Sequence, residues 1–315
     1  MSQYAIALRD VEAARIRIAL PSTPVMTSHA LDAIAGRHLF FKCESFQKTG
    51  SFKARGAMSA VSALDPDVAS RGVVTHSSGN HAQALAWAAG TRGIPCFVVM
   101  PTNAPEAKRA AVLSYGGRIT DCEPTLAARV SGCAKIQAET GATLIPPFDH
   151  PLVIAGQGTL ALELLEQVPK LTHVIVPVGG GGLIAGITLA LREHAPEVIV
   201  IGAEPANADD AARSKASGER LEQLAPDTIA DGLRTSLGEL TWPVVRDLVA
   251  RIVTPSEEEI AAAMRLVFTR LKVVIEPSAG VSAAAALRAA ELAPKGAQIA
   301  VVLCGGNVDL DHLPW

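Results

Sequence analysis

The stretch KCESFQKTGSFKARGA, from Lys42 to Ala57, combines three lysines and an arginine with a Thr-Gly-Ser turn. Ser51 is a good N-cap residue, so we expect a helix to begin there and to carry Lys53 in its first turn. The positive end of the helix dipole disfavours a cation, which makes a neutral amine easier to maintain. A neutral lysine can bind a carbonyl covalently and accept a proton. The alternative is a solvated charge, and Lys42 and Arg55 are expected to be ordinary surface or packing charges.

Four consecutive glycines follow the apolar run VIVPV and precede a helical pattern: Gly179, Gly180, Gly181 and Gly182. Backbone N–H groups at the start of a helix bind phosphate. A tight turn is the plain alternative, although turns rarely need four glycines. A dinucleotide site is another, because Gly180, Gly182 and Ala185 match GxGxxG/A and Glu204 ends the next strand about 20 residues later. On this stretch alone, NAD remains a candidate cofactor.

A neutral lysine combined with a phosphate site suggests pyridoxal phosphate, whose aldehyde binds an amine and whose phosphate binds backbone amides. The stretch THSSGNHAQALA (75–86) ends a strand and begins a helix, so it could hold a substrate carboxylate, and the Asn80 amide could bond the phenolic oxygen of the cofactor. The stretch VVLCGGN (301–307) places Cys304 at the same edge. The plain alternatives are a capping turn and an inert buried thiol.

Short β-branched runs predict the strands that position these groups. They lie at 72–76, 96–100, 172–178, 198–204 and 298–306, and they are typical of strands buried on both faces of a parallel sheet. Ala- and Leu-rich segments with helical spacing lie between them, so strand and helix alternate in an α/β fold. Ligands in such folds bind at the carboxyl ends of strands, often in a cleft between two sheets.

The composition limits the classes of partner. The chain has 315 residues, 49% of them hydrophobic, and a net charge of -3 from 28 Lys+Arg and 31 Asp+Glu. Interspersed charges argue against nucleic-acid and membrane binding, and the N-terminus does not resemble a signal or transit peptide. Five cysteines without a CxxC pair argue against a disulfide framework and a zinc site. We expect a cytoplasmic protein that binds small molecules or copies of itself.

Seven stretches together resemble the serine racemase and serine/threonine dehydratase family: KCESFQKTGSFKARGA, THSSGNHAQALA, VIAGQGTLALELL, VPVGGGGLIAG, GAEPANADDA, IADGLRTSLG and VVLCGGNVDL. The likeness runs in unbroken order from about Tyr4 to Leu310. It implies a fold-type-II pyridoxal-phosphate enzyme similar to tryptophan synthase β, with two open, twisted, mainly parallel sheets flanked by helices and an active site in the interdomain cleft. It further implies a large cofactor-binding domain (1–51 plus 147–315), a small mobile domain (52–146) and a homodimer.

The resemblance also assigns a cofactor-binding set: Phe52, Lys53, Asn80, Gly179, Gly180, Gly181, Gly182, Leu183, Glu276 and Cys304. Lys53 would be the Schiff-base lysine and the base on one face of the cofactor. Ser78 would be the acid/base on the opposite face, a position where many threonine dehydratases carry alanine. Cys304 would face the pyridine nitrogen, and so weak a partner leaves that nitrogen largely unprotonated, which favours β-elimination.

The family's divalent cation site corresponds to Glu204, the Ala208 carbonyl and Asp210, all hard oxygen ligands suited to Mg²⁺, Ca²⁺ or Mn²⁺. The same Glu204 served the dinucleotide interpretation, so it cannot support both. Four residues match the ATP contacts of animal serine racemase: Lys48, Thr49, Gln83 and Tyr115. The stretch TSHA (27–30) departs from that enzyme's nucleotide motif and argues against nucleotide activation.

The expected substrate contacts are Ser77, Ser78, Gly79, Asn80, His81, Arg129, Arg234 and Thr235. Two arginines, Arg129 and Arg234, could bind a second carboxylate bidentately and favour 3-hydroxyaspartate over serine. The alternative for Arg234 is a structural ion pair. The stretch IPPFDHP (145–151) is similar to those of bacterial dehydratases and hydroxyaspartate dehydratases.

The sequence therefore predicts a dehydratase that eliminates the β-hydroxyl of 3-hydroxyaspartate, serine or threonine and releases a 2-oxo acid and ammonia. Serine or aspartate racemisation with side dehydratase activity remains an alternative, because Lys53 and Ser78 would provide bases on both faces. An NAD-dependent oxidoreductase and a non-catalytic amino-acid-binding regulator are the more distant alternatives.

Overall fold

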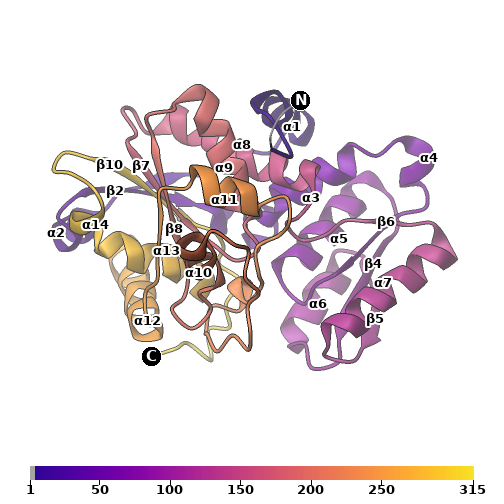
Figure 1. The fold of residues 1–315 in the computed structure, drawn as a ribbon. Coiled ribbons are helices and arrows are strands. Elements are labelled where there is room, and N and C mark those ends of the chain that lie inside the picture. The colour runs from indigo at the N-terminus through magenta and orange to yellow at the C-terminus, as the bar shows by residue number, and fades with distance from the viewer. Residues whose placement is uncertain (1–3) are drawn as a thin grey trace.

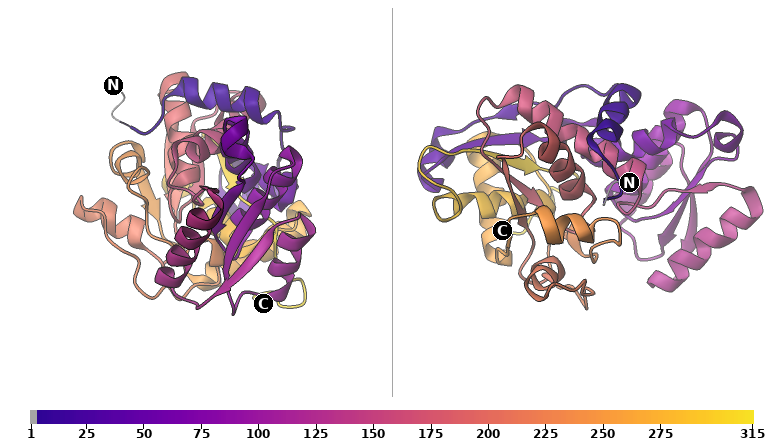
Figure 2. Two further views of the ribbon diagram at one scale, coloured as in Figure 1. Left: turned by 90° about the vertical axis from the view of Figure 1, so that its right-hand side faces the viewer. Right: turned by 45° about the horizontal axis from the view of Figure 1, so that its top comes forward.

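The computed structural model describes residues 4–315, so the first three residues of the predicted large domain lie outside the described part. The chain forms two lobes, each built around one sheet (Figure 1). Helix α1 packs against α8, α3 and α9 near the junction of the lobes (Figure 2). An ion pair between Lys108 of α6 and Asp231 of the large lobe also joins them.

The large lobe contains a six-stranded sheet in the order β1-β2-β10-β7-β8-β9. Its strands are β1 (Val25–Met26), β2 (His38–Cys43), β7 (His173–Pro177), β8 (Ile199–Ala203), β9 (Arg251–Val253) and β10 (Gln298–Leu303). All neighbouring pairs are parallel except β1 with β2. The predicted runs at 172–178, 198–204 and 298–306 are confirmed as β7, β8 and β10.

The small lobe contains a four-stranded parallel sheet in the order β5-β4-β3-β6. Its strands are β3 (Val73–His76), β4 (Cys96–Pro101), β5 (Arg118–Cys122) and β6 (Thr143–Leu144). The runs predicted at 72–76 and 96–100 are confirmed as β3 and β4. This sheet lies entirely inside the range 52–146, although the division into a large and a mobile small domain stays a prediction.

Helices flank both sheets, as the alternating pattern predicts. In the large lobe they are α1 (Leu8–Ile18), α2 (His29–Ala35), α8 (Pro151–Gln167), α9 (Gly182–His194), α10 (Asp210–Ser217), α11 (Trp242–Leu248), α12 (Glu257–Leu266), α13 (Pro277–Leu287) and α14 (Ala289–Leu292). In the small lobe they are α3 (Lys53–Ser62), α4 (Pro66–Ala69), α5 (Asn80–Arg92), α6 (Glu106–Ser114) and α7 (Leu126–Thr140). The predicted α/β class with two mainly parallel sheets is therefore confirmed.

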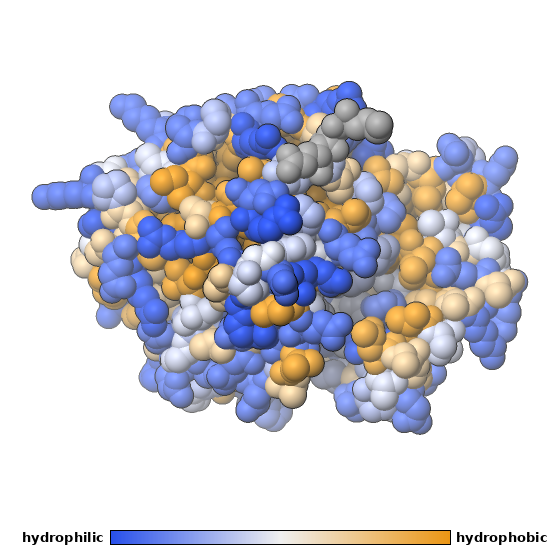
Figure 3. Space-filling model, viewed as in Figure 1, coloured by the Kyte–Doolittle hydropathy of each residue, from blue (hydrophilic) through white to orange (hydrophobic). Residues whose placement is uncertain are grey.

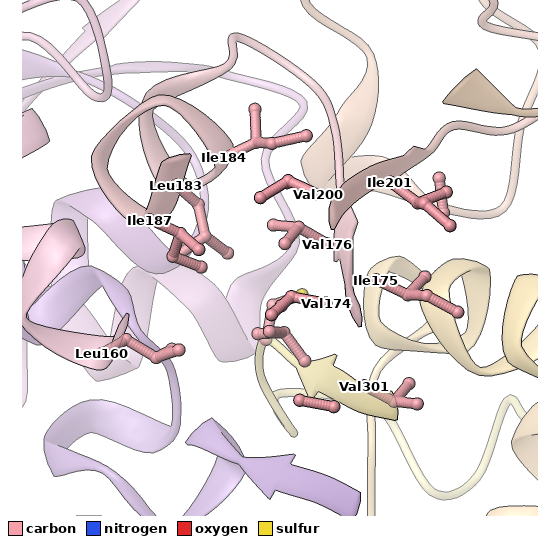
Figure 4. Close-up of a cluster of buried hydrophobic side chains, with 14 of the residues drawn as sticks. Leu160, Val174, Ile175, Val176, Leu183, Ile184, Ile187, Val200, Ile201 and Val301 are labelled. Carbon is pink, nitrogen blue, oxygen red and sulfur yellow. The ribbon is translucent and has the colours of Figure 1, made fainter. Parts of the chain in front are cut away.

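The core of the large lobe shows why its strands are apolar throughout. Side chains alternate along a strand, so Val174 and Val176 of β7 face α9 while Ile175 points toward α13 (Figure 4). Both faces of β7 are therefore buried, as its continuous β-branched run predicts. The small lobe has one apolar cluster under α3 and α5 and a second under α7.

The surface combines polar and apolar residues over the face drawn in Figure 3, without a wholly polar or wholly apolar side. None of the helices in residues 4–315 is long and apolar enough to span a membrane. Of the two settings expected for Lys42 and Arg55, surface or packing charges, the structure shows the second. Both are fully buried and ion-paired, Lys42 with Glu163 and Arg55 with Glu44 and Glu163.

Candidate active site

Lys53 is the first residue of α3, as its position in the motif predicts. Its Nζ donates to the carbonyl oxygen of Pro147 at 2.7 Å and lies 5.0 Å from the centroid of the Phe52 ring. Burial lowers the pKa of the Lys53 amine to about 8, while Cys304 and Glu276 act in the opposite direction. At neutral pH a minor fraction of this amine is therefore neutral, far more than for an ordinary lysine, as a lysine that binds a carbonyl requires.

The predicted cap at Ser51 is wrong. Phe52, not Ser51, occupies the N-cap position, and Ser51 is extended with φ of −160°. Its backbone forms an antiparallel bridge with Gly305 at the end of β10, and the Phe52 N–H donates to the Cys304 carbonyl at 3.0 Å. Long-range pairing to the large sheet thus replaces the local cap and attaches the start of α3 to the carboxyl end of β10.

The glycine loop joins β7 to α9, and each of its four glycines is crowded. A Cβ on Gly180 would lie 2.3 Å from Cδ1 of Phe148, and a Cβ on Gly182 would lie 2.9 Å from Cβ of the same residue. Gly181 caps α9 with a positive φ of 85°, which disfavours other residues. The first N–H groups of a 13-residue helix lack intrahelical acceptors. The loop therefore offers unshielded backbone donors that suit the phosphate of pyridoxal phosphate.

The segment just before α8 contacts both the lysine and the glycine loop, and the sequence motifs did not identify its residues individually. Pro147 accepts from Lys53, and Phe148 packs on Gly180. The Asp149 carboxylate accepts from the backbone N–H groups of Glu239 and Leu240, both at 2.9 Å. The unusual composition of IPPFDHP is the signal that could have identified these residues.

Asn80, the first residue of α5, belongs to a chain of side-chain amides and a carboxylate. Its Nδ2 donates to both carboxylate oxygens of Glu276, at 2.8 and 2.9 Å, and its Oδ1 accepts from Asn307 at 2.8 Å. Burial raises the pKa of Glu276 to about 7, an effect that the Asn80 hydrogen bond partly opposes. The Cys304 thiol lies 3.9 Å from Glu276, and burial raises its pKa well above the ordinary value, so it is a neutral thiol.

The turn before α5 holds the predicted substrate residues Ser77, Ser78 and Gly79. Gly79 is the N-cap, its N–H donates to Ser77 Oγ at 3.3 Å, and a Cβ on it would meet open space. His81 lies behind this turn, 2% exposed, with Nε2 bonded to the Ile145 carbonyl at 2.9 Å. Burial, and then the Lys53 charge, lowers the pKa of His81 to about 3, so this imidazole is neutral.

The two arginines predicted to bind a second carboxylate lie in different settings. Arg129, in the first turn of α7, donates through its Nε to the Thr125 carbonyl at 3.3 Å. Burial, and then the Arg129 charge, lowers the pKa of His76 at the end of β3. Arg234 uses its Nε to donate to the Thr228 carbonyl at 3.1 Å, so its guanidinium is engaged by its own loop. Thr235 follows it on the surface. Each guanidinium thus bonds a carbonyl of its own segment, and the role of both arginines in binding a second carboxylate stays a prediction.

Glu204 and Asp210 form a pair of buried carboxylates at the end of β8. Glu204 accepts from the backbone N–H groups of Ala211 and Ala212, and burial followed by the Asp210 charge raises its pKa to about 9. Burial raises the pKa of Asp210 to about 6, and its Oδ1 has no hydrogen-bond partner among the described residues. Ala208 is fully buried. Two mutually repelling carboxylates and an unpaired oxygen suit a cation.

In residues 4–315, no group of three His, Cys, Asp or Glu side chains converges on a metal position. A cation between Glu204 and Asp210 would therefore depend on carbonyl and water oxygens as further ligands. The predicted nucleotide contacts lie in three elements: Lys48 and Thr49 in a 3-10 turn, Gln83 in α5 and Tyr115 at the end of α6. Their role stays a prediction, as does that of each site residue above.

Comparisons with known proteins agree with this geometry. Residues 16–305 match the family model described as "Pyridoxal-phosphate dependent enzyme". The chain is 49% identical to serine racemase of Mus musculus (100% of this chain, 95% of the relative) and 51% identical to beta-hydroxyaspartate dehydratase of Paracoccus denitrificans (96% and 95%).

Solved structures extend the likeness to three dimensions. Maize serine racemase superimposes with a TM-score of 0.94 at 47% identity, covering 98% of this chain and 95% of that chain. The serine racemase of Dictyostelium discoideum superimposes with a TM-score of 0.92 at 44% identity, covering 97% of this chain and 100% of that chain. These matches favour pyridoxal phosphate over the NAD alternative at the glycine loop. The chain belongs to the family of pyridoxal-phosphate-dependent enzymes.

Proposed function

We propose that this enzyme is a dehydratase that removes the β-hydroxyl group of a small β-hydroxy-α-amino acid, with 3-hydroxyaspartate, serine and threonine as candidates. The observation that carries the proposal is the partly neutral amine of Lys53, which donates to Pro147, the neighbour of the Phe148 that packs on the glycine loop. Relatives at about half identity include a beta-hydroxyaspartate dehydratase and serine racemases, which supports the same chemistry.

The residues present suit the cofactor. The amine of Lys53 would hold its aldehyde carbon, and the N–H groups of the glycine loop and Leu183 would hold its phosphate. Phe52 and Asn80 would contact its ring and phenolic oxygen, and the neutral thiol of Cys304 would be a weak partner for its ring nitrogen. When bound, pyridoxal phosphate withdraws electrons from the substrate Cα and weakens the Cα–H bond.

The protein groups then handle protons. Neutral Lys53 would accept the Cα proton on one face, and the turn at the start of α5 would orient the substrate carboxylate through its N–H groups and hydroxyls. The β-hydroxyl leaves with a proton as water. The released enamine becomes an imine, which hydrolyses to a 2-oxo acid and ammonia. Ser78 could move a proton on the opposite face, so racemisation is the second candidate activity.

A turnover panel tests this proposal. Purified enzyme is given D- and L-serine, L-threonine and the four 3-hydroxyaspartates, and both 2-oxo acid and enantiomer formation are measured. We expect elimination from at least one substrate, a near-visible absorbance band, and loss of both in Lys53→Ala. We expect Ser78→Ala to reduce inversion more than elimination. If Lys53→Ala retains both the band and turnover, the proposal is refuted.

We also propose that a divalent cation, Mg²⁺, Ca²⁺ or Mn²⁺, binds at Glu204, the Ala208 carbonyl and Asp210. The buried carboxylate pair with an unpaired Asp210 oxygen supports this. Each cation should raise the thermal midpoint of the enzyme and a chelator should reverse the rise, but not in Asp210→Asn. The matched control is Asp209→Asn, because Asp209 is half-exposed and pairs with Arg213. Equal responses in the two variants would exclude this cation site.

A cytoplasmic homodimer completes the proposal. Large apolar side chains such as Phe46 (59% exposed) and Leu310 (61% exposed) are available for burial against a second copy. Light scattering during size exclusion should give twice the chain mass of 32.7 kDa. A single-chain mass across the micromolar range would contradict the dimer.

A further inference from the structure

Four charged side chains form a buried cluster under the start of α3. Lys42, Glu44 and Arg55 have no exposed surface, and Glu163 is 4% exposed. Two cations and two anions make the cluster neutral. Removing charges from water is unfavourable unless the groups are closely paired and fully hydrogen-bonded, so a cluster this deep needs strict geometry.

Arg55 is the centre of this cluster, and its guanidinium is saturated with acceptors. Its Nε and one terminal nitrogen donate to the two oxygens of Glu44, both at 2.8 Å. Its two terminal nitrogens donate to the two oxygens of Glu163, at 2.6 and 2.9 Å, and one also donates to Thr159 Oγ1 at 3.2 Å. Two bidentate carboxylate contacts fix both the position and the plane of the group. Lys42 completes the cluster through Glu163 at 2.5 Å.

The cluster joins three elements at the candidate active site. Arg55 is two residues after Lys53 in the first turn of α3. Glu44 directly follows β2, and Thr159 and Glu163 are four residues apart on one face of α8. Helix α8 begins four residues after Pro147, the hydrogen-bond acceptor of Lys53. The two ends of the Lys53 to Pro147 contact are therefore held by elements that Arg55 connects.

A close helix crossing supports the same arrangement. A Cβ on Gly156 of α8 would lie 2.6 Å from the Arg55 carbonyl, and a Cβ on Gly56 of α3 would lie 2.3 Å from Gln157 Nε2. The Gly56 N–H donates to Gln157 Oε1 at 3.1 Å. At so short a separation the backbones have little room to slide, so the carboxylate contacts and the crossing specify one relative position for α3 and α8.

We propose that Arg55 is a positioning residue, which holds the first turn of α3 and with it the Lys53 amine through its two bidentate carboxylate contacts. This inference rests on the proposed role of Lys53. Arg55 acts through geometry rather than through its charge, because the cluster is neutral as a whole. The ionisable groups that face the amine are Glu276, Cys304 and His81, which lie outside the cluster.

Two changes separate position from charge and from stability. Arg55→Lys keeps the cation and loses the planar fork. Glu44→Gln with Arg55→Met removes one complete ion pair, so the remaining Lys42 and Glu163 still balance. Arg55→Met alone leaves an unbalanced buried charge and should lower the urea midpoint, and the paired change should recover part of that loss.

Helix α8 also carries a matched control pair. Arg15 binds Glu166 of α8 bidentately, at 2.6 and 2.9 Å, but both side chains are about half exposed and neither belongs to α3. Arg15→Met with Glu166→Gln therefore removes an arginine–glutamate pair from α8 without touching the cluster. This double variant should keep the wild-type pH dependence of cofactor loading, which is the measurement described next.

The measurement uses the full-length chain stripped of cofactor and reloaded with pyridoxal phosphate at a series of pH values. The rate at which the near-visible band appears follows the neutral fraction of the amine. In the wild type we expect its midpoint near pH 8. In Arg55→Lys and in the paired variant a displaced, better solvated amine should raise the midpoint by about one pH unit, which lowers the rate at pH 7 about tenfold.

An unchanged midpoint in folded Arg55→Lys and in the paired variant would overturn the proposal, whatever their stability. If one of these two variants fails to fold, the other decides alone, because both keep the cluster neutral, and no rise in its midpoint overturns the proposal equally. Failure of the proposed function is distinguishable, because the band would then persist in Lys53→Ala. If Lys53→Ala loses the band while the Arg55 variants keep the wild-type pH midpoint, only the positioning role is refuted.

Discussion

Replacing Lys53 by methionine should stabilise the cofactor-free chain at neutral pH while it abolishes covalent attachment of the cofactor. Burial depresses the pKa of this amine, so at pH 7 the folded chain must keep most of a buried group protonated in an unfavourable setting. Methionine has a similar length and no charge, so it should fill the same space without that penalty.

The magnitude follows from the pKa values. The pKa falls from 10.5 to about 8, a difference of about 2.5 pH units. At ~1.4 kcal/mol per unit this corresponds to ~3 kcal/mol at most. The side chain is only half-buried, so solvent screening reduces the figure. The Pro147 carbonyl also loses its donor, which costs about 1 kcal/mol. We therefore expect a net gain of about 1 to 2 kcal/mol.

The pH dependence gives the sharper test. A folded pKa below the unfolded one means that the unfolded chain binds more protons between pH 8 and 10.5. The penalty is therefore complete below pH 8 and is relieved as the pH rises through that window. Urea unfolding of both cofactor-free chains at pH 7 and pH 10 should show an advantage of Lys53→Met that shrinks at the higher pH.

The control for this comparison is Lys135→Met, because the Lys135 side chain is 76% exposed. It should change the unfolding free energy by less than ~0.5 kcal/mol at either pH. A Lys53→Met chain that is no more stable than wild type at pH 7, or whose advantage does not depend on pH, would refute the argument from burial.

Three further outcomes are expected. Gly180→Ala should lose cofactor affinity, measured by equilibrium dialysis, because its Cβ would lie 2.3 Å from the Phe148 ring, and adding Phe148→Ala should recover part of the loss. Arg129→Met should raise KM for 3-hydroxyaspartate about tenfold or more with a smaller effect on serine, and equal effects would exclude a contact with the second carboxylate. Iodoacetamide should label the half-buried Cys122 before the fully buried Cys304 in the folded chain, as mass spectrometry of digested samples can show.

The strands that the sequence predicts are those buried on both faces, because only these give continuous β-branched runs. The five predicted runs became β3, β4, β7, β8 and β10. Strands β1, β2, β5, β6 and β9 were not predicted, and β2 and β5 show why. Strand β2 ends in Lys42 and Cys43, a charge that only tertiary pairing makes compatible with burial. Strand β5 is an edge strand with a largely exposed face, so it has no apolar run.

Local motifs identified Lys53, the glycine loop and Asn80 because each lies where a strand ends or a helix begins. The Arg55 cluster was not predicted, since its partner Glu163 is 108 residues away in the sequence. A signal was nevertheless present, because Thr159, Glu163 and Gln167 recur every four residues along one face of a mostly apolar helix. The cap at Ser51 failed because pairing with Gly305, far along the chain, prevailed over a local preference.

The hydrogen bond between Lys53 and Pro147 joins the two points at which the chain crosses between the lobes. The chain leaves the large lobe near residue 52 and returns near residue 147, and these two crossings meet at this 2.7 Å contact. An amine that has become covalently occupied has fewer hydrogens to donate, so the return crossing loses its partner. We therefore expect that covalent loading of Lys53 removes one hydrogen bond between the two crossings, while the Arg55 contacts and the close packing of α3 on α8 still hold them together.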